Sequence, residues 1–178
     1  MILACSGEVD VRTNRMFVVA MIVGVAAAAA GLAAQKRDDS APLEPLTVLF
    51  MCPHGAAKSV LASAYFKRAA RERGLNVRVE SAGTDPDPEV SLRVADHLKK
   101  GGFDVPVAKP RRVRETDMAV ADVVISIGCD PKSMPTPRGT LVRWDDVPAP
   151  SEDFAAADAR IRERVTQLVD ELVRKQRQ

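Results

Sequence analysis

The feature that most constrains the fold is a short apolar run followed directly by a loop of small residues. Leu46–Cys52 reads L-T-V-L-F-M-C and leads into the turn-forming letters P-H-G. A short apolar run bounded by a turn is typical of a strand buried in a parallel sheet. Residues 59–73 then place apolar side chains four apart, and Gly74 is a natural helix stop. The sequence therefore predicts a strand, a loop and a helix in succession.

The rest of the carboxyl-terminal region continues this alternation. Three further strands are predicted, at 76–81, 122–127 and 140–144. A helix is expected to start at Asp87, with that carboxylate as its cap and Pro88 at the first helical position. Ser151 is expected to cap the last helix. Strands that alternate with helices imply an α/β fold, in which a parallel sheet is covered on both faces.

The amino-terminal region is predicted to be separate from this domain. Residues 16–34 carry no charge, and Arg12 and Arg15 precede them. This pattern is typical of a signal peptide, although the segment is also close to the length of a membrane-spanning helix. We expect an exported protein, periplasmic or extracytoplasmic, or one that contacts the membrane through this segment. The predicted divisions are a signal peptide or membrane anchor at 1–34, a linker at 35–45 and the folded domain at 46–178.

Composition excludes several classes of function. The net charge is only +2 and aromatic residues make up 4% of the chain, which argues against a nucleic-acid partner because such domains usually carry a clustered basic face or stacking aromatics. The three cysteines and two histidines form no C-x-x-C or H-E-x-x-H pattern. We therefore expect neither a disulfide scaffold nor a metal site.

The loop at 52–59, C-P-H-G-A-A-K-S, is the main candidate for a functional site. It follows the carboxyl end of a strand, where ligands bind in open α/β sheets. Its small residues let the backbone curl, so that several N–H groups and the positive end of the next helix face an anion. The predicted oxyanion-binding residues are His54, Gly55, Ala56, Ala57 and Lys58.

Cys52 lies at the base of this predicted anion site. Such a position favours the thiolate, the nucleophilic form of cysteine. Lys58 is expected to contact the oxyanion, and Ser59 to donate a hydrogen bond to the sulfur. A thiolate beside an oxyanion cradle is suited to attack on phosphorus or arsenic.

The loop resembles the C-x5-R-S loop of the low-molecular-weight protein tyrosine phosphatases and the related arsenate reductases. The flanks agree, with V-L-F-M-C before the loop, S-A-G-T at 81–84 and A-D-V-V-I-S-I-G at 121–128. The resemblance covers about residues 46–175. It implies a flavodoxin-like three-layer domain with a four-stranded parallel sheet in the order 2-1-3-4, no cofactor, and a phosphocysteine or arseno-cysteine intermediate. The implied ligands are phosphate, arsenate or a phosphorylated substrate.

The sequence departs from the family pattern at three positions. The loop arginine of the family is Lys58 here, which keeps the charge but loses the bidentate geometry. Gly55 stands where the family usually has asparagine. Ala149 stands where the family has an aspartate as general acid, and Asp146, or Asp145, is the candidate substitute from a shifted position. Loss of the acid would slow the departure of an alcohol by about 10²–10⁴-fold.

Cys129 matches the first resolving cysteine of the thioredoxin-linked arsenate reductases, but no cysteine lies near Thr136, where the second would stand. Three functions therefore remain open. The favoured one is a phosphatase that hydrolyses phosphomonoesters through phosphocysteine. The second is an arsenate reductase that uses Cys52 with Cys129 or an external thiol reductant. The third is an oxyanion-binding module with little turnover.

Overall fold

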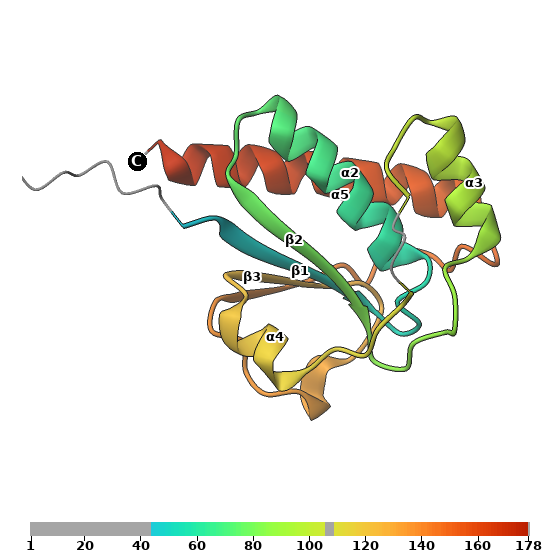
Figure 1. Ribbon diagram of the computed structural model, residues 1–178, viewed down its shortest axis with the longest axis horizontal. Coiled ribbons are helices and arrows are strands. Elements are labelled where there is room, and N and C mark those ends of the chain that lie inside the picture. Colours follow the sequence, from blue (N-terminus) through green and yellow to red (C-terminus); the bar gives the residue numbers. More distant parts are fainter. Residues whose placement is uncertain (1–43, 106–108, 178) are drawn as a thin grey trace, which may run out of the picture. The chain divides into compact units, whose positions relative to one another are not determined.

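The computed structural model describes residues 44–105 and 109–177. They form an α/β domain in which a four-stranded parallel sheet lies between helices (Figure 1), as predicted. The predicted signal peptide or anchor and most of the predicted linker lie outside the described residues. Within the described ranges, no helix combines the length and apolar character needed to cross a membrane.

The sheet aligns the carboxyl ends of its strands at one edge. Its order is β2-β1-β3-β4, which confirms the order implied by the resemblance. Every neighbouring pair is parallel, and Cys52, the last residue of β1, stands in register with Gly83. The strands are β1 (Leu46–Cys52), β2 (Val77–Gly83), β3 (Val123–Ser126) and β4 (Thr140–Arg143).

Helices of very different length cover the two faces of the sheet. The longer helices share one face, and the single turn and a half of α4 lies on the other (Figure 1). A short 3-10 helix, η1 (Pro131–Ser133), follows β3. The helices are α2 (Lys58–Glu72), α3 (Leu92–Lys100), α4 (Glu115–Val120) and α5 (Phe154–Gln176).

The alternation of side chains along β1 divides the core into two clusters. Val48, Phe50 and Cys52 belong to the large cluster under α2 and α5, whereas Leu49 and Met51 belong to a smaller cluster beside α4. All five are almost fully buried, so a strand with both faces covered accounts for its unbroken apolar run. Because the side-chain period of a strand is two, Cys52 faces the α2 side.

Two helices begin later than predicted, and neither uses its expected cap. Asp87 caps no helix; it lies in an irregular segment before α3, which begins at Leu92. The cap of α5 is Asp153, whose carboxylate accepts a hydrogen bond from the Ala156 amide, and not Ser151. The helix α4 and the turn η1 were not predicted from the sequence, since each is short and lacks a clear apolar period.

An ion-pair cluster fixes the segment before α4 against the end of β2. The Gly83 amide donates to Arg111 O, and the Val113 amide donates to Gly83 O, each at 2.9 Å. The Arg111 guanidinium donates to Asp117 at 2.6 and 3.2 Å, and the Arg114 amide donates to the same carboxylate at 2.8 Å. Burial tends to raise the pKa of the Asp117 carboxyl, but these hydrogen bonds outweigh it and lower the pKa.

Asp117→Asn is expected to lower the free energy of unfolding by about 1–3 kcal/mol at pH 7, because hydrogen bonds to a charged partner are lost. A lowered folded pKa stabilises the protein above the unfolded value of about 3.9, and this contribution disappears as the pH falls. The difference between Asp117→Asn and the wild type should therefore shrink between pH 7 and pH 3. Urea unfolding at both values measures it, with the exposed Glu115→Gln as control.

Candidate active site

The loop that follows β1 connects Cys52 to the first turn of α2. Lys58 is the first residue of that helix, and no side chain caps its amino end at Ala57. The first N–H groups of a helix have no partner within the helix, and they carry the positive end of its dipole. The sequence places these groups directly beside the cysteine, as expected for a strand that runs straight into a short loop and a helix.

The carbonyl groups of the loop face away from this helix end, toward residues 84–91. Four amides of that segment donate to four loop carbonyls, so the two stretches of backbone run side by side. The pairs are Thr84 to Cys52 O at 3.2 Å, Asp85 to Pro53 O at 2.8 Å, Asp87 to His54 O at 3.0 Å and Ser91 to Ala56 O at 3.0 Å.

The loop amides consequently point the other way. In a trans peptide the N–H lies opposite the C=O of the preceding residue, so the amides of His54, Gly55 and Ala57 face away from residues 84–91. Within the part of the chain that the structure describes, no protein group accepts a hydrogen bond from these three amides. Several unpaired amides beside a helix amino end form an anion-binding cradle.

Two glycines allow the loop to approach β2 this closely. Gly55 has φ of +62°, which glycine adopts at little cost. A Cβ at Gly83 would lie 2.7 Å from Gly55 N and 2.8 Å from the carbonyl carbon of His54. The S-A-G-T stretch therefore ends β2 with the one residue that leaves room for the loop.

Cys52 has a hydrogen-bond partner suited to a nucleophile. Its Sγ lies 3.3 Å from Ser59 Oγ, and Ser81 Oγ lies 3.4 Å from the same hydroxyl. Ser59 is fully buried, so its hydroxyl is held by these neighbours. Once the thiol has lost its proton, the Ser59 hydroxyl can donate to the sulfur and stabilise the thiolate.

The sulfur-bearing end of the loop opens into a cavity of about 400 Å³. Its lining comes from the loop, from Asp87, Ser91 and Arg93, and from residues 149–151 and Phe154. The Arg93 guanidinium lies over the Phe154 ring at 4.5 Å. Cys52, His54, Lys58, Asp87, Arg93 and Ala149 are among the residues that line the cavity.

Lys58 supplies one of the positive charges of this cavity and lies close to the turn that follows β3. A Cβ at Gly128 would lie 2.5 Å from Lys58 Nζ, so the ammonium lies directly over that glycine. The side chain is half-buried and lines the cavity with Cys52. Lysine is a point charge with three rotatable donors, and it can meet one oxygen of a bound anion from this position.

Cys129 is packed on the other side of the sheet. It belongs to the cluster with Met51 and Val124 beside α4, whereas Cys52 belongs to the cluster under α2. Its Sγ lies 3.2 Å from Ser126 Oγ and donates to Met51 O at 3.7 Å. Burial is the main cause that raises the pKa of the Cys129 thiol, with the neighbouring Cys52 acting in the same direction. Cys129 is therefore held as a neutral thiol.

The predicted substitutes for the general acid lie away from the cavity. Asp145 accepts from Arg143 at 2.9 and 3.2 Å. Asp146 accepts from Arg164 at 2.8 Å, and that hydrogen bond is the main cause that lowers the pKa of its carboxyl. Neither aspartate is among the residues that line the cavity. Ala149 does line it, and a methyl group has no proton to give.

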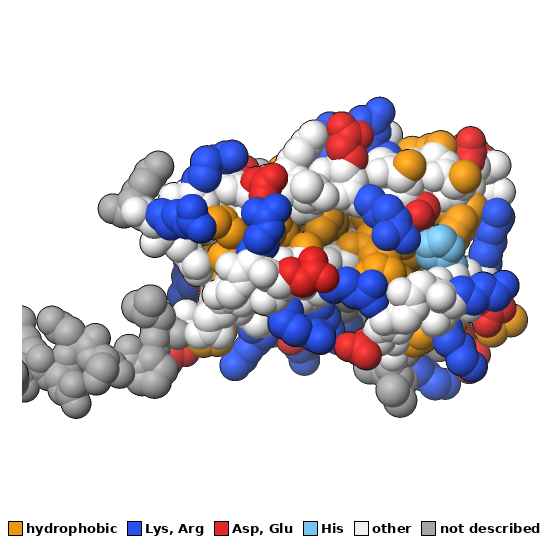
Figure 2. Space-filling view, turned by 90° about the horizontal axis from the view of Figure 1, so that it is seen from above, with side chains coloured by type: hydrophobic (Ala, Val, Ile, Leu, Met, Phe, Trp, Pro, Cys, Tyr) orange, Lys and Arg blue, Asp and Glu red, His pale blue; other side chains and the backbone are white. Residues whose placement is uncertain are grey.

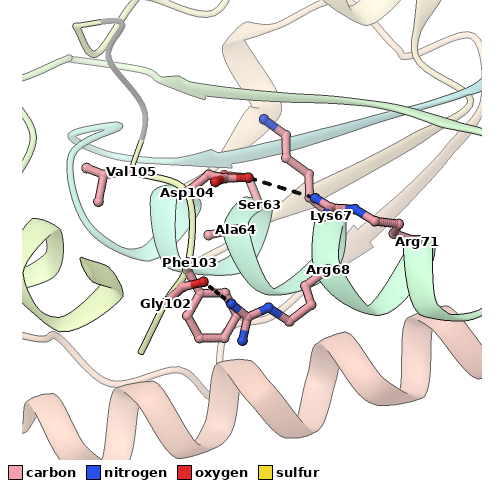
Figure 3. Close-up of a pocket in the computed structure, with 9 residues that line it drawn as sticks. All are labelled: Ser63, Ala64, Lys67, Arg68, Arg71, Gly102, Phe103, Asp104 and Val105. Atoms are coloured by element: carbon pink, nitrogen blue, oxygen red, sulfur yellow. Dashed lines mark hydrogen bonds and ion pairs between the residues drawn. The ribbon is translucent and has the colours of Figure 1, made fainter. Parts of the chain in front are cut away.

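A second cavity, of about 300 Å³, lies between α2 and residues 102–105 (Figure 3). It is lined by basic side chains, but two of them bind the neighbouring segment. Arg71 pairs with Asp104 at 3.8 Å, and Arg68 donates to Gly102 O and lies over the Phe103 ring at 3.4 Å. Figure 2 shows Lys and Arg side chains spread widely over the same helical face. This cavity contains none of the predicted site residues.

The structure thus brings together Cys52, Lys58, Ser59 and the loop from His54 to Ala57, and it leaves Asp146 and Cys129 outside the cavity. The sequence interpretation missed Asp87, which was assigned to a helix cap, and Arg93. The sequence feature that could have indicated them is the Pro-rich stretch before α3. This stretch does not form a helix but runs along the loop.

Comparison with known proteins agrees with this geometry. Residues 47–134 match the family model described as low molecular weight phosphotyrosine protein phosphatase. An arsenate reductase from Archaeoglobus fulgidus is 31% identical, with 69% of this chain and 98% of that chain covered and a TM-score of 0.57. The chain belongs to the low molecular weight phosphotyrosine phosphatase family.

Other solved structures of this family type share the fold at lower identity. A low molecular weight phosphotyrosine phosphatase from Vibrio cholerae is 22% identical over 72% of this chain and 97% of that chain, with a TM-score of 0.63. A thioredoxin-dependent arsenate reductase from Corynebacterium glutamicum is 24% identical over 90% of this chain and 73% of that chain, with a TM-score of 0.64. No curated protein sequence matches the chain.

Proposed function

We propose that the protein is a cysteine-dependent phosphatase that hydrolyses phosphomonoesters. Cys52 attacks phosphorus, the ester oxygen leaves, and water then releases phosphate from the phosphocysteine. The loop amides and Lys58 hold the phosphoryl oxygens through both steps. Ser59 stabilises the sulfur when it leaves as thiolate.

One observation carries this proposal. Four loop carbonyls are engaged on the outer side by residues 84–91, so the amides of His54, Gly55 and Ala57 are directed to the other side with no protein acceptor among the described residues. Such an arrangement is built in advance for an oxyanion and needs no rearrangement when the anion binds. Membership of the phosphatase family supports the same reaction.

Arsenate reduction is the second candidate, favoured by the 31% identity to the Archaeoglobus fulgidus arsenate reductase. Arsenate resembles phosphate in shape and charge and would occupy the same cradle. Cys129 lies in the opposite core cluster and burial raises the pKa of its thiol, so it is poorly suited to supply the thiolate that would resolve an arseno-cysteine. An external thiol reductant is therefore the partner that this candidate requires.

The deciding experiment compares two reactions of the full-length chain. Release of p-nitrophenol from p-nitrophenyl phosphate without added thiol, inhibited by vanadate, supports the phosphatase. Arsenate reduction that depends on added thiol, without ester hydrolysis, supports the second candidate. Binding of phosphate with neither reaction would leave the third candidate, an oxyanion-binding module.

Lys58→Met is expected to weaken inhibition by phosphate about 10–100-fold, because one charge-assisted hydrogen bond of about 1.5–3 kcal/mol is lost. Lys58→Arg keeps the charge and can donate to two oxygens in a fixed bidentate geometry, so inhibition should be at least as strong as in the wild type. Lys67→Met removes an exposed charge of the same helix outside the cavity and serves as the control. Equal weakening in Lys58→Met and Lys67→Met would contradict a direct contact.

We also propose that residues 16–34 export the chain or anchor it to a membrane. The support is the uncharged composition of this segment and the two arginines before it. Amino-terminal sequencing of the mature protein would reveal a start near residue 35 if the segment is a cleaved signal.

A further inference from the structure

The cavity lacks a proton donor at the position where the family carries its acid. Ala149 occupies that position, and the nearby Asp145 and Asp146 are bound to arginines outside the cavity. The leaving oxygen of a phosphate ester gains negative charge as its bond to phosphorus breaks. For an alkyl or simple phenyl ester that charge needs a proton, and a positioned acid contributes about 10²–10⁴-fold to the rate.

Four charged or titratable side chains line the cavity besides Cys52. Lys58, whose Nζ lies over Gly128, is assigned by the proposed function to the phosphoryl oxygens. The Arg93 guanidinium stays charged at all relevant pH values and gives up no proton. The remaining two are His54 and Asp87, whose side chains form a pair in which Nδ1 lies 3.3 Å from Oδ1.

The backbone holds this pair in place. The Asp87 amide donates to His54 O at 3.0 Å, so the two residues are joined through both main chain and side chain. With Nδ1 facing the carboxylate, the imidazole has its Nε2 on the opposite side of the ring. A carboxylate that orients a histidine through Nδ1 and leaves Nε2 for the substrate is a recurrent arrangement in acid–base catalysis.

We propose that His54 is the general acid of this site and that Asp87 is the residue that positions it. The inference rests on the proposed phosphatase activity and adds to it the source of the proton. His54 is 64% exposed and Asp87 51% exposed, so a substrate that enters the cavity can reach the imidazole.

The proton and electron balance is complete with these groups and water. In the first step the Sγ–P bond forms, the P–O bond of the ester breaks, and the proton on Nε2 passes to the leaving oxygen, which departs as the alcohol. In the second step neutral Nε2 takes a proton from water, the water oxygen bonds to phosphorus, and the Sγ–P bond breaks. Phosphate leaves, and both the thiolate and the protonated imidazole are regenerated.

The test uses two substrates that differ only in the need for a proton. p-Nitrophenolate departs readily without protonation, whereas the phenolate of phenyl phosphate does not. In the full-length chain, His54→Gln is expected to lower kcat/KM for phenyl phosphate about 10²-fold or more and to change kcat/KM for p-nitrophenyl phosphate by less than about threefold, because kcat/KM reports only the steps up to departure of the leaving group. Phosphate inhibition should be unchanged, because the loop amides and Lys58 are intact.

Rescue and coupling separate this role from a structural one. Added imidazole should restore phenyl phosphate hydrolysis in His54→Ala, since the position is open to solvent. Asp87→Asn should lower kcat/KM for phenyl phosphate more than kcat/KM for p-nitrophenyl phosphate, and it should add no further loss in the His54→Gln background, as expected for residues that act as a unit. Asp85→Asn is the matched control, because Asp85 pairs with Arg112 and does not line the cavity.

The outcomes distinguish the inference from the proposed function. Equal losses of kcat/KM with both substrates in His54→Gln, or no loss with either, would overturn the role of His54 as the acid while leaving Cys52-dependent hydrolysis intact. No hydrolysis of either ester by the wild type would overturn the phosphatase proposal, and the role of His54 with it.

Discussion

Cys52→Ser is expected to lower kcat for p-nitrophenyl phosphate by at least about 10⁴-fold, the scale seen when the nucleophile of a covalent mechanism is removed. A serine hydroxyl at this position stays protonated at neutral pH and is a poor nucleophile without a base. The loop amides and Lys58 are unchanged, so the affinity for phosphate should stay within a few fold. Steady-state kinetics and calorimetric titration with phosphate measure the two quantities.

Cys129→Ser is the matched control for this prediction. Cys129 is the other cysteine among the described residues and is packed against Met51, away from the cavity. Its replacement should change the rate of ester hydrolysis by less than about threefold. Persistent hydrolysis in Cys52→Ser would exclude the phosphocysteine intermediate, and equal losses in both variants would indicate that Cys129 takes part in the reaction.

Gly83→Ala is expected to lower kcat/KM about 10²-fold and the free energy of unfolding by about 1–3 kcal/mol. The added Cβ would lie 2.7 Å from Gly55 N and 2.9 Å from Pro53 O. These are backbone atoms and cannot turn aside, so the loop must shift as a whole. A displacement of about 1 Å at a reacting centre is enough for a rate loss of that size.

Gly74→Ala distinguishes this steric effect from a general cost of replacing glycine. Gly74 has φ of +69° and no neighbour within 4 Å of an added Cβ, so the backbone strain costs about 1 kcal/mol without contact to the loop. Its kcat/KM should equal that of the wild type. If Gly83→Ala kept full activity and stability, the tight packing between the loop and β2 would be contradicted.

The strands and the position of Cys52 at the start of the loop could be predicted from sequence because each depends on local pattern. A short apolar run such as 46–52 that ends at a turn is typical of a buried strand, and a loop of small residues before a helix indicates an anion site. The anion-binding cradle is formed by backbone amides. It therefore remains recognisable in the sequence although Lys58 and Gly55 stand where the family usually has arginine and asparagine.

The features that were missed depend on pairing between distant segments. Asp87 followed by Pro88 has the local signature of a helix start, but its amide and carboxylate both bind His54. The sequence placed Asp146 close to Trp144 and hence to the site, yet Arg164 of α5 binds its carboxylate. Local propensity could not reveal either partner, because each lies far along the chain.

The four amide-to-carbonyl hydrogen bonds between residues 84–91 and the loop join main-chain atoms. Their strength is therefore independent of the side chains that the two segments carry, apart from the glycines at the contact. A protein with this scaffold can therefore change the charged residue of the loop, lose the acid at position 149 or use a histidine of the loop as acid. The anion-binding cradle keeps its shape in each case. Substitutions of these side chains can thus change which leaving groups the site accepts before they weaken binding of the oxyanion.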